Sequence, residues 1–158
     1  MSTIYLRVIP TSPSFVPNAE AQLQAREMFE QFVEGADEIE AVVTEEIEFV
    51  DAGGNLPTVK CPTCGSDLNN WWIAVVDKAY ENHFRNLNLQ MPCCGAISSL
   101  NDLDYEYPIG FARFVLQARD PHLLMGFDPH KKRDLSASDI QQLEQILGCS
   151  LRRIWARI

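Results

Sequence analysis

Apolar residues recur along the N-terminal third of the chain with periods that predict a strand, a helix and a second strand. Ile4 to Ile9 alternates as a strand, and the prolines that follow it end the alternation. Asn18 is a suitable N-cap for a helix that runs to about Glu34. Residues 38–50 are rich in Val, Ile and Thr, which predicts a long strand or a hairpin. The apolar face of the expected helix consists of Ala25, Met28, Phe29, Phe32 and Val33.

The C-terminal third shows the same order of elements. Residues 111–119 fit either a helix or a strand, and we favour the strand because the alternation is cleaner and Gly110 precedes it. Ser136 or Ser138 is expected to cap a helix that ends at Leu147. Residues 151–158 then alternate as a final strand.

The middle of the chain predicts smaller elements. Residues 70–84 read as a helix, residues 87–91 as a short strand, and residues 96–105 as its return strand. The outer elements, strand-helix-strand repeated twice, predict an α+β fold of the ferredoxin-like βαβ–βαβ type. We expect a single domain over residues 1–158, with residues 58–105 inserted between its halves as a zinc-knuckle, zinc-ribbon-like subdomain.

Composition narrows the class of protein. Hydrophobic residues make up 46% of the 158 residues, and no run approaches the roughly 18 apolar residues of a membrane span. Met1 to Pro10 lacks a basic region followed by an apolar run, so we expect no signal peptide, no membrane association and a cytoplasmic location. Five cysteines in a reducing compartment favour metal binding over disulfides.

Charge is distributed unevenly around a net value of −9. Residues 20–51 contain eleven acids and one base, whereas residues 111–158 contain eight bases and five acids. The acidic part is a poor surface for nucleic acid but suits a basic protein partner, unless it is only a solvated face. Trp71, beside a second tryptophan, is a candidate partner anchor or a core residue. The expected acidic contacts are Glu38, Glu40, Glu45, Glu46 and Glu48.

Two short segments carry the clearest chemistry: Cys61-Pro-Thr-Cys-Gly65 and Met91-Pro-Cys-Cys-Gly95. Each is a turn that can direct thiolates toward a metal, and two such turns make a tetrahedral zinc site. Alignment places Met91 opposite Cys61, and a thioether is a poor zinc ligand. We therefore expect the ligands Cys61, Cys64, Cys93 and Cys94, with His83 as the alternative to Cys93.

A closed site with four protein ligands has no open position for water, so we expect its Zn²⁺ to be structural and the protein not to be an enzyme. A dithiol redox role for Cys61 and Cys64 competes with this interpretation. It is disfavoured because the next predicted helix begins several residues after Cys64. The sequence has no phosphate-binding glycine loop and no zinc-protease helix motif.

The Cys61–Gly65 segment resembles the knuckles of zinc-ribbon and rubredoxin-like proteins. The resemblance extends over some forty residues of the chain. That resemblance implies a metal held between two turns, with zinc or iron as the ion. The whole chain resembles small bacterial proteins without an assigned activity, in its first strand, residues 5–10, and its Pro92-Cys-Cys-Gly95 turn.

Two hypotheses for function follow. The first is a non-catalytic, zinc-stabilised protein-binding module, such as an immunity or antitoxin-like protein that blocks a basic, toxin-like partner with its acidic face. The second is a zinc-ribbon factor associated with nucleic acid, based on Arg152, Arg153 and Arg157 near the C-terminus.

Overall fold

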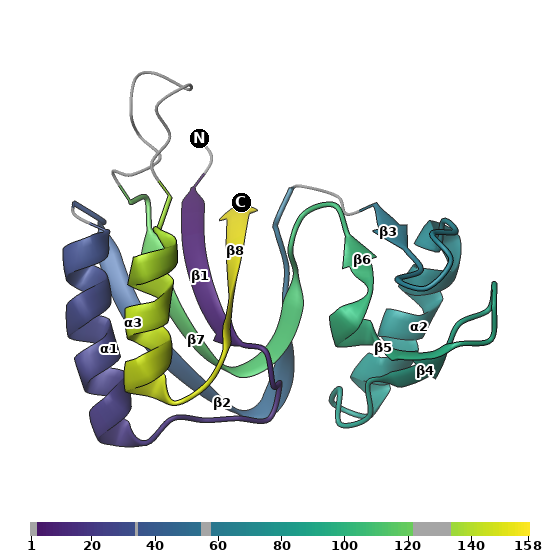
Figure 1. Cartoon of the computed structure of the whole chain (residues 1–158), viewed down its shortest axis with the longest axis horizontal. Coiled ribbons are helices and arrows are strands. Elements are labelled where there is room, and N and C mark those ends of the chain that lie inside the picture. Colours follow the sequence, from purple (N-terminus) through teal and green to yellow (C-terminus); the bar gives the residue numbers. More distant parts are fainter. Residues whose placement is uncertain (1–2, 34, 55–57, 122–133) are drawn as a thin grey trace.

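The computed structural model describes residues 3–33, 35–54, 58–121 and 134–158. It is an α+β structure, as the sequence predicts, built on a four-stranded antiparallel sheet of order β2-β7-β1-β8 (Figure 1). The start of β1 and the end of β8 lie at the same end of this sheet. Its strands are β1 (Ile4–Pro10), β2 (Glu38–Val50), β7 (Gly110–Arg119) and β8 (Leu151–Arg157).

Two helices, α1 (Ala19–Phe32) and α3 (Ala137–Leu147), lie side by side on one face of the sheet (Figure 1). Asn18 caps α1, its side-chain oxygen accepting from the Ala21 N–H at 2.8 Å. Ser136, the first of the two predicted candidates, caps α3 in a reciprocal pair with Asp139. The apolar faces of both helices meet the sheet in one buried cluster, which includes Leu6, Val8, Ala25, Phe29, Val33, Phe114, Leu116, Ala118, Leu135, Leu143 and Leu147.

The strand interpretation of residues 111–119 is confirmed, because they belong to β7, which pairs with β2 on one side and β1 on the other. Its even-numbered side chains from Phe114 to Ala118 face the helices. Residues 38–50 form one strand rather than a hairpin, with a register shift between Val43 and Glu48. Such an irregularity bends a strand and lets its far end follow another surface.

The 58–105 segment lies between β2 and β7, which pair directly with each other, so it occupies the connection of a long hairpin. The prediction of one return strand at 96–105 is wrong, because this stretch forms two strands, β5 (Ile97–Ser99) and β6 (Asp104–Tyr105), separated by the short 3-10 helix η1 (Leu100–Asp102). The Ser99 side chain accepts from the Asn101 N–H at 3.2 Å and thereby starts η1. The segment contains β3 (Val59–Lys60), α2 (Asn69–Glu81), β4 (Asn88–Gln90), β5 (Ile97–Ser99), η1 (Leu100–Asp102) and β6 (Asp104–Tyr105), with β3 paired to β6 and β4 to β5.

Aromatic side chains connect this segment to the sheet. Phe111 of β7 is fully buried, and its ring centroid lies 5.3 Å from that of Phe49 on β2 and 5.1 Å from that of Phe84, just after α2. These rings belong to a second buried cluster that extends through the segment to Cys61 and Met91. The sheet therefore supplies part of the core on which the cysteine-bearing turns rest.

A polar junction reinforces that apolar contact. Asn101 of η1 is only 4% exposed, yet its amide nitrogen donates to the Thr11 carbonyl at 2.8 Å and its oxygen accepts from the Phe111 N–H at 3.3 Å. Arg152 of β8 donates to both oxygens of Asn101. Because every polar atom of a buried amide must find a partner, this junction fixes the segment in one position on the sheet.

Candidate metal centre

The two cysteine-bearing turns have the same backbone conformation. In the first, the Cys61 N–H donates to the Ser66 carbonyl and the Gly65 N–H to the Cys61 carbonyl, both at 2.9 Å. Residues 91–96 repeat the two bonds at 2.8 and 2.9 Å, with Met91 in the place of Cys61. The repetition supports the sequence alignment of the two turns, including the equivalence of Met91 with Cys61.

Glycine is required at the fifth position of each turn. Gly65 has a φ of 76° and Gly95 a φ of 75°, in the left-handed region that side chains with a Cβ rarely adopt. The left-handed residue reverses the chain, so the cysteine before each glycine lies beside the start of its own turn. The Cys-x-x-Cys-Gly pattern thus has a direct geometric cause.

The structure brings the sulfur atoms of Cys61, Cys64, Cys93 and Cys94 within 4.8 Å of one another. Sγ of Cys61 lies 3.8 Å from Sγ of Cys94, and Sγ of Cys64 lies 3.2 Å from that of Cys93, both much longer than a disulfide bond. Four thiolates around a tetrahedral zinc ion at ~2.3 Å would lie about 3.8 Å apart. These four cysteines can therefore hold a metal ion.

Met91 is a core residue, although it takes the place of Cys61 in the second turn. It is 1% exposed and packs in the second buried cluster, as the thioether of a core residue. Cys93, whose equivalent in the first turn is Thr63, supplies the remaining sulfur instead. The alternative ligand His83 lies elsewhere, beside Glu45 and Glu46 around a separate hollow of about 450 Å³.

Hydrogen bonding distinguishes the four thiols electrostatically. The hydroxyl and N–H of Ser66 lower the pKa of Cys64 to about 6, and backbone N–H groups, that of Cys64 foremost, lower the pKa of Cys61. The neighbouring Cys64 sulfur, followed by desolvation, raises the pKa of Cys93 to about 12. For Cys94, the Ala96 N–H favours the thiolate, but desolvation and Cys61 leave its pKa raised.

Four sulfurs this close cannot all be thiolates unless a cation offsets their mutual repulsion. Soft thiolate donors in a set of four select zinc or iron over magnesium or calcium. The donor set therefore fits a closed metal centre of the kind the sequence predicts. Cys149 takes no part, because it packs against the helix-side cluster, where burial raises its thiol pKa to about 11.

The expected acidic contacts do not form one unpaired surface. Glu38 forms an ion pair with Arg119 at 3.5 Å, and Glu40 accepts from Gln117 at 3.0 Å. Glu46 forms a two-bond ion pair with Arg85 of the 58–105 segment, at 2.5 and 3.2 Å. Glu45 and Glu48 are exposed, and neither has an ion pair within the described part of the chain. Trp71 is half-buried against the second cluster, which is the environment of a core residue.

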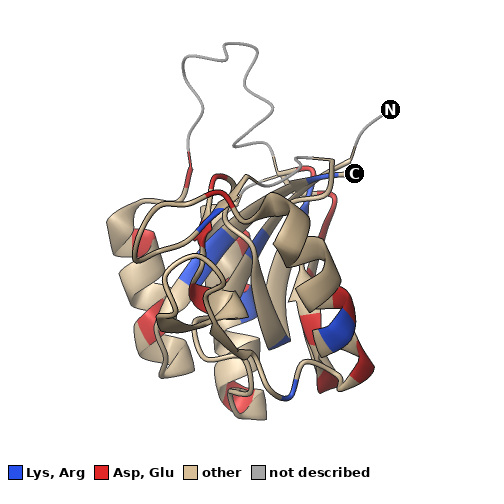
Figure 2. Cartoon of the chain, turned by 90° about the vertical axis from the view of Figure 1, so that its right-hand side faces the viewer, with Lys and Arg blue, Asp and Glu red and all other residues tan. Residues whose placement is uncertain are grey.

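Basic residues lie mainly on the strands at the centre of the view, and acidic residues lie around them (Figure 2). The basic strand residues proposed for nucleic acid have protein partners. Arg152 donates to carbonyl oxygens of Asn101 and Ile109, both at 2.9 Å, and Arg153 pairs with Asp134 at 3.2 Å. Arg157 is bonded through its backbone to residues 52–54. The guanidinium groups of Arg152 and Arg153, which already have carbonyl and carboxylate partners, are poorly placed to neutralise phosphates.

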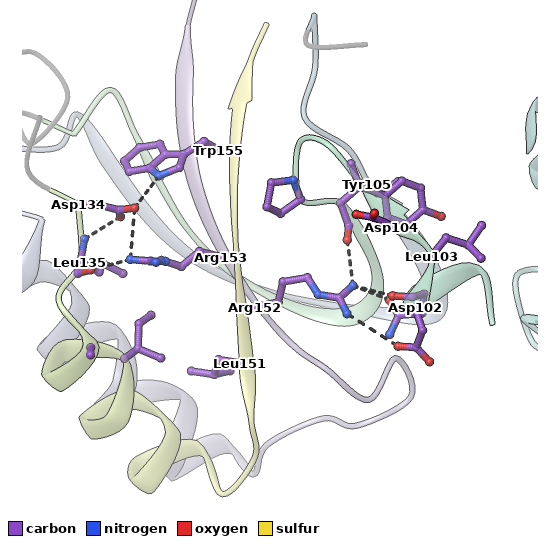
Figure 3. Close-up of a pocket in the computed structure, with 15 residues that line it drawn as sticks. Asp102, Leu103, Asp104, Tyr105, Asp134, Leu135, Leu151, Arg152, Arg153 and Trp155 are labelled. Carbon is purple, nitrogen blue, oxygen red and sulfur yellow. Dashed lines mark hydrogen bonds and ion pairs between the residues drawn. The ribbon is translucent and has the colours of Figure 1, made fainter. Parts of the chain in front are cut away.

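Sequence reasoning missed a cavity of about 810 Å³ beside β8 (Figure 3). One wall of this cavity comes from residues 101–109 and the other from residues 134–140. These two segments are far apart in the sequence, and only the tertiary fold brings them to the same strand. The alternation of residues 151–158 predicted the strand β8, but it could not show that β8 lies at the edge of the sheet.

No protein-family model, curated protein or solved structure matches this chain. None of the helices in the described ranges is long and apolar enough to cross a membrane.

Proposed function

We propose that this protein is a non-catalytic protein-binding module whose 58–105 segment is stabilised by structural zinc. The observation that carries the proposal is the gathering of four cysteine sulfurs at two matching turns. Four thiolate ligands fill a tetrahedral zinc site and leave no position for a reacting water or substrate. The ion would therefore contribute folding free energy rather than chemistry.

The small size of the secondary structure around the sulfurs explains why a metal is useful there. β3 and β6 pair over two residues each, and β4 and β5 over three. Two-stranded pairs this short are not stable alone in water. A metal bound to both turns would join the turn that follows β3 to the β4–β5 hairpin. The five cysteines, none in a disulfide, suit a reducing cytoplasm.

We also propose the ferredoxin-like arrangement for the sheet and helices. Taking the four strands in chain order as first to fourth, the sheet order is second, third, first, fourth, antiparallel throughout, with both helices on one face. That order supports a split βαβ–βαβ architecture with residues 58–105 inserted into its central hairpin.

For the partner, we propose a basic protein, as for an immunity or antitoxin-like role. The exposed, unpaired Glu45 and Glu48 on the edge strand β2, together with the net charge of −9, favour approach of a positively charged surface. Residues 38, 40 and 46 contribute less, because their carboxylates already have partners.

Zinc is tested by metal analysis of protein purified without chelator, for which we expect one zinc per chain and unfolding of the 58–105 segment on chelation. Partner binding is tested by affinity capture from the source cell at about 50 mM salt, where charge pairing is strong. Glu45→Lys with Glu48→Lys should abolish capture of basic proteins, whereas the matched control, Glu27→Lys with Glu30→Lys on α1, should not. Well under one zinc per chain, or equal capture by both variants, would refute the corresponding part of the proposal.

A further inference from the structure

The outer edge of β8 is an open pairing site between two walls. In the antiparallel pairing with β1, the Thr11 N–H donates to the Ser150 carbonyl and the Thr3 N–H to the Ile158 carbonyl. The even-numbered residues of β8 therefore direct their backbone N–H and C=O groups toward β1. The odd-numbered residues direct their backbone N–H and C=O groups outward. Among the described residues, no backbone partner meets the outward groups of Arg153 or Trp155.

Both ends of this edge already have partners. The Arg157 N–H donates to the Ala52 carbonyl at 3.2 Å and its carbonyl accepts from Gly54 at 2.6 Å, in a parallel bridge. At the other end, the Leu151 N–H donates to the Glu144 carboxylate at 2.9 Å. The unpaired stretch between them lies along the 810 Å³ cavity, whose size is in the range of binding pockets.

Neighbouring arginines of β8 hold the two walls by pointing to opposite sides of the strand (Figure 3). Arg153 reaches the helix side, where it donates to the Leu135 carbonyl at 2.6 Å and pairs with Asp134. Arg152 reaches the 58–105 segment, where it donates to Asn101 and Ile109. A groove whose walls are fixed in advance loses less entropy when it is filled.

The two walls differ in chemistry. The helix-side wall is mainly apolar, with Leu135, Ile140, Leu151 and Trp155. The opposite wall presents Asp102, whose side chain is 67% exposed and lies 4.0 Å from Arg152, and exposed Asp104, which has no ion pair among the described residues. In an extended peptide, successive side chains point to opposite sides, so alternate residues would meet each wall.

We propose that this groove binds an extended peptide segment of a partner protein by strand addition to β8, with apolar side chains on the helix side alternating with Lys or Arg on the side of Asp102 and Asp104. The peptide backbone supplies partners to the outward groups of Arg153 and Trp155, which have none among the described residues. A second copy of this chain fits less well, because Arg152 is the basic residue of its β8 that would face Asp102 and Asp104, and that guanidinium already donates to Asn101 and Ile109. The inference rests on the proposed protein-binding function and names the partner's recognition element.

The test is selection from a phage-displayed library of random heptapeptides on the zinc-loaded protein at low salt. We expect enriched sequences with alternating apolar and basic residues. Arg153→Pro removes the outward N–H and should weaken their binding about tenfold beyond Arg153→Ala, which keeps it. Melting temperature and zinc content verify that both variants fold.

A second measurement does not depend on the variants. Amide hydrogen exchange in the unaltered protein should slow at Arg153 and Trp155 when a selected peptide is added, with little change at Ile154, which already pairs with β1. No enrichment, enrichment without alternation, equal binding by the two variants, or dimerisation of this chain through β8 would overturn the proposal. If capture of basic proteins still depended on Glu45 and Glu48 in that case, the proposed function would be retained and only the peptide-binding groove would be rejected.

Discussion

Nη1 of Arg152 lies 2.9 Å from the carbonyl oxygen of Asn101 and 3.1 Å from its side-chain oxygen, across 51 positions of sequence. The same nitrogen donates to the Ile109 carbonyl at 2.9 Å. One guanidinium group therefore holds the edge strand, the 58–105 segment and the start of β7 together. Gly110 makes room for it, because a Cβ there would lie 3.2 Å from Nη1 and 2.5 Å from Cδ1 of Ile9.

Asn101→Ala should destabilise the protein by about 1–3 kcal/mol, because it leaves the Thr11 carbonyl and the Phe111 N–H without their partner. Urea unfolding followed by fluorescence measures the change. Asn70→Ala, on an exposed position of α2, is the control and should change stability by less than about 0.5 kcal/mol. Equal effects of the two substitutions would mean that the junction contributes nothing.

Gly53→Ala should destabilise more than Gly148→Ala, although the two glycines have φ values of 66° and 76°. Backbone strain is shared, at about 1–2 kcal/mol. A Cβ on Gly53 would lie 2.2 Å from the Arg157 carbonyl oxygen, whereas nothing lies within 4 Å of one on Gly148. Thermal unfolding of the two variants compares them, and a Gly148→Ala cost as large as that of Gly53→Ala would contradict the close approach.

Met91→Leu should keep full metal content and lower stability by less than about 1.5 kcal/mol, because Met91 is a core residue and the exchange nearly conserves volume. Zinc per chain and urea unfolding are the measurements. Loss of the metal on this substitution would show that the thioether is a ligand and not only a core side chain.

Cys93→Ser should weaken zinc binding by well over about a hundredfold, since substitutions in the outer shell of a metal site already cost 10–100-fold. Competition with a chromogenic chelator measures the affinity. Cys149→Ser is the matched control, because that thiol packs away from the other four and its loss should leave zinc affinity unchanged. Unaltered affinity in Cys93→Ser would return His83 to consideration as the fourth ligand.

Phe111→Ala should cost about 3–5 kcal/mol, because the ring is fully buried between the sheet and the 58–105 segment. If the segment depends on the sheet for its core, the variant should also lose zinc to chelator faster. Calorimetry measures the change in stability, and the rate of zinc release to a chelator measures the effect on the metal site. A stable variant with an unchanged release rate would show that the stability of the segment does not depend on its packing against the sheet.

Local signals in the sequence were sufficient for most of the elements. Asn18 and Ser136 start their helices by side-chain hydrogen bonds within three residues, so both helix starts could be predicted. The four cysteines could be predicted to meet because each turn has its own backbone signature. The division of residues 96–105 was missed because its cause is tertiary: Asn101 is drawn to partners at positions 11, 111 and 152.

Tertiary contacts that the sequence does not reveal also explain why the expected acidic face is partly neutralised. Spacing alone placed five glutamates on one strand, but it could not reveal that Arg85, Gln117 and Arg119 would meet three of them. The β8 groove could not be predicted for a related reason, because an edge is a property of the whole sheet and not of the strand that forms it.

The position of β1 in the sheet determines when it can be completed during synthesis. β1 pairs only with β7 and β8 in the described sheet, so its partners begin at residues 110 and 151. A ribosome releasing this chain in order would present both cysteine turns before either partner of the first strand exists. Leu6, Val8 and Ile9, all fully buried in the folded chain, must therefore wait until residues 151–157 have emerged before their strand has neighbours on both sides.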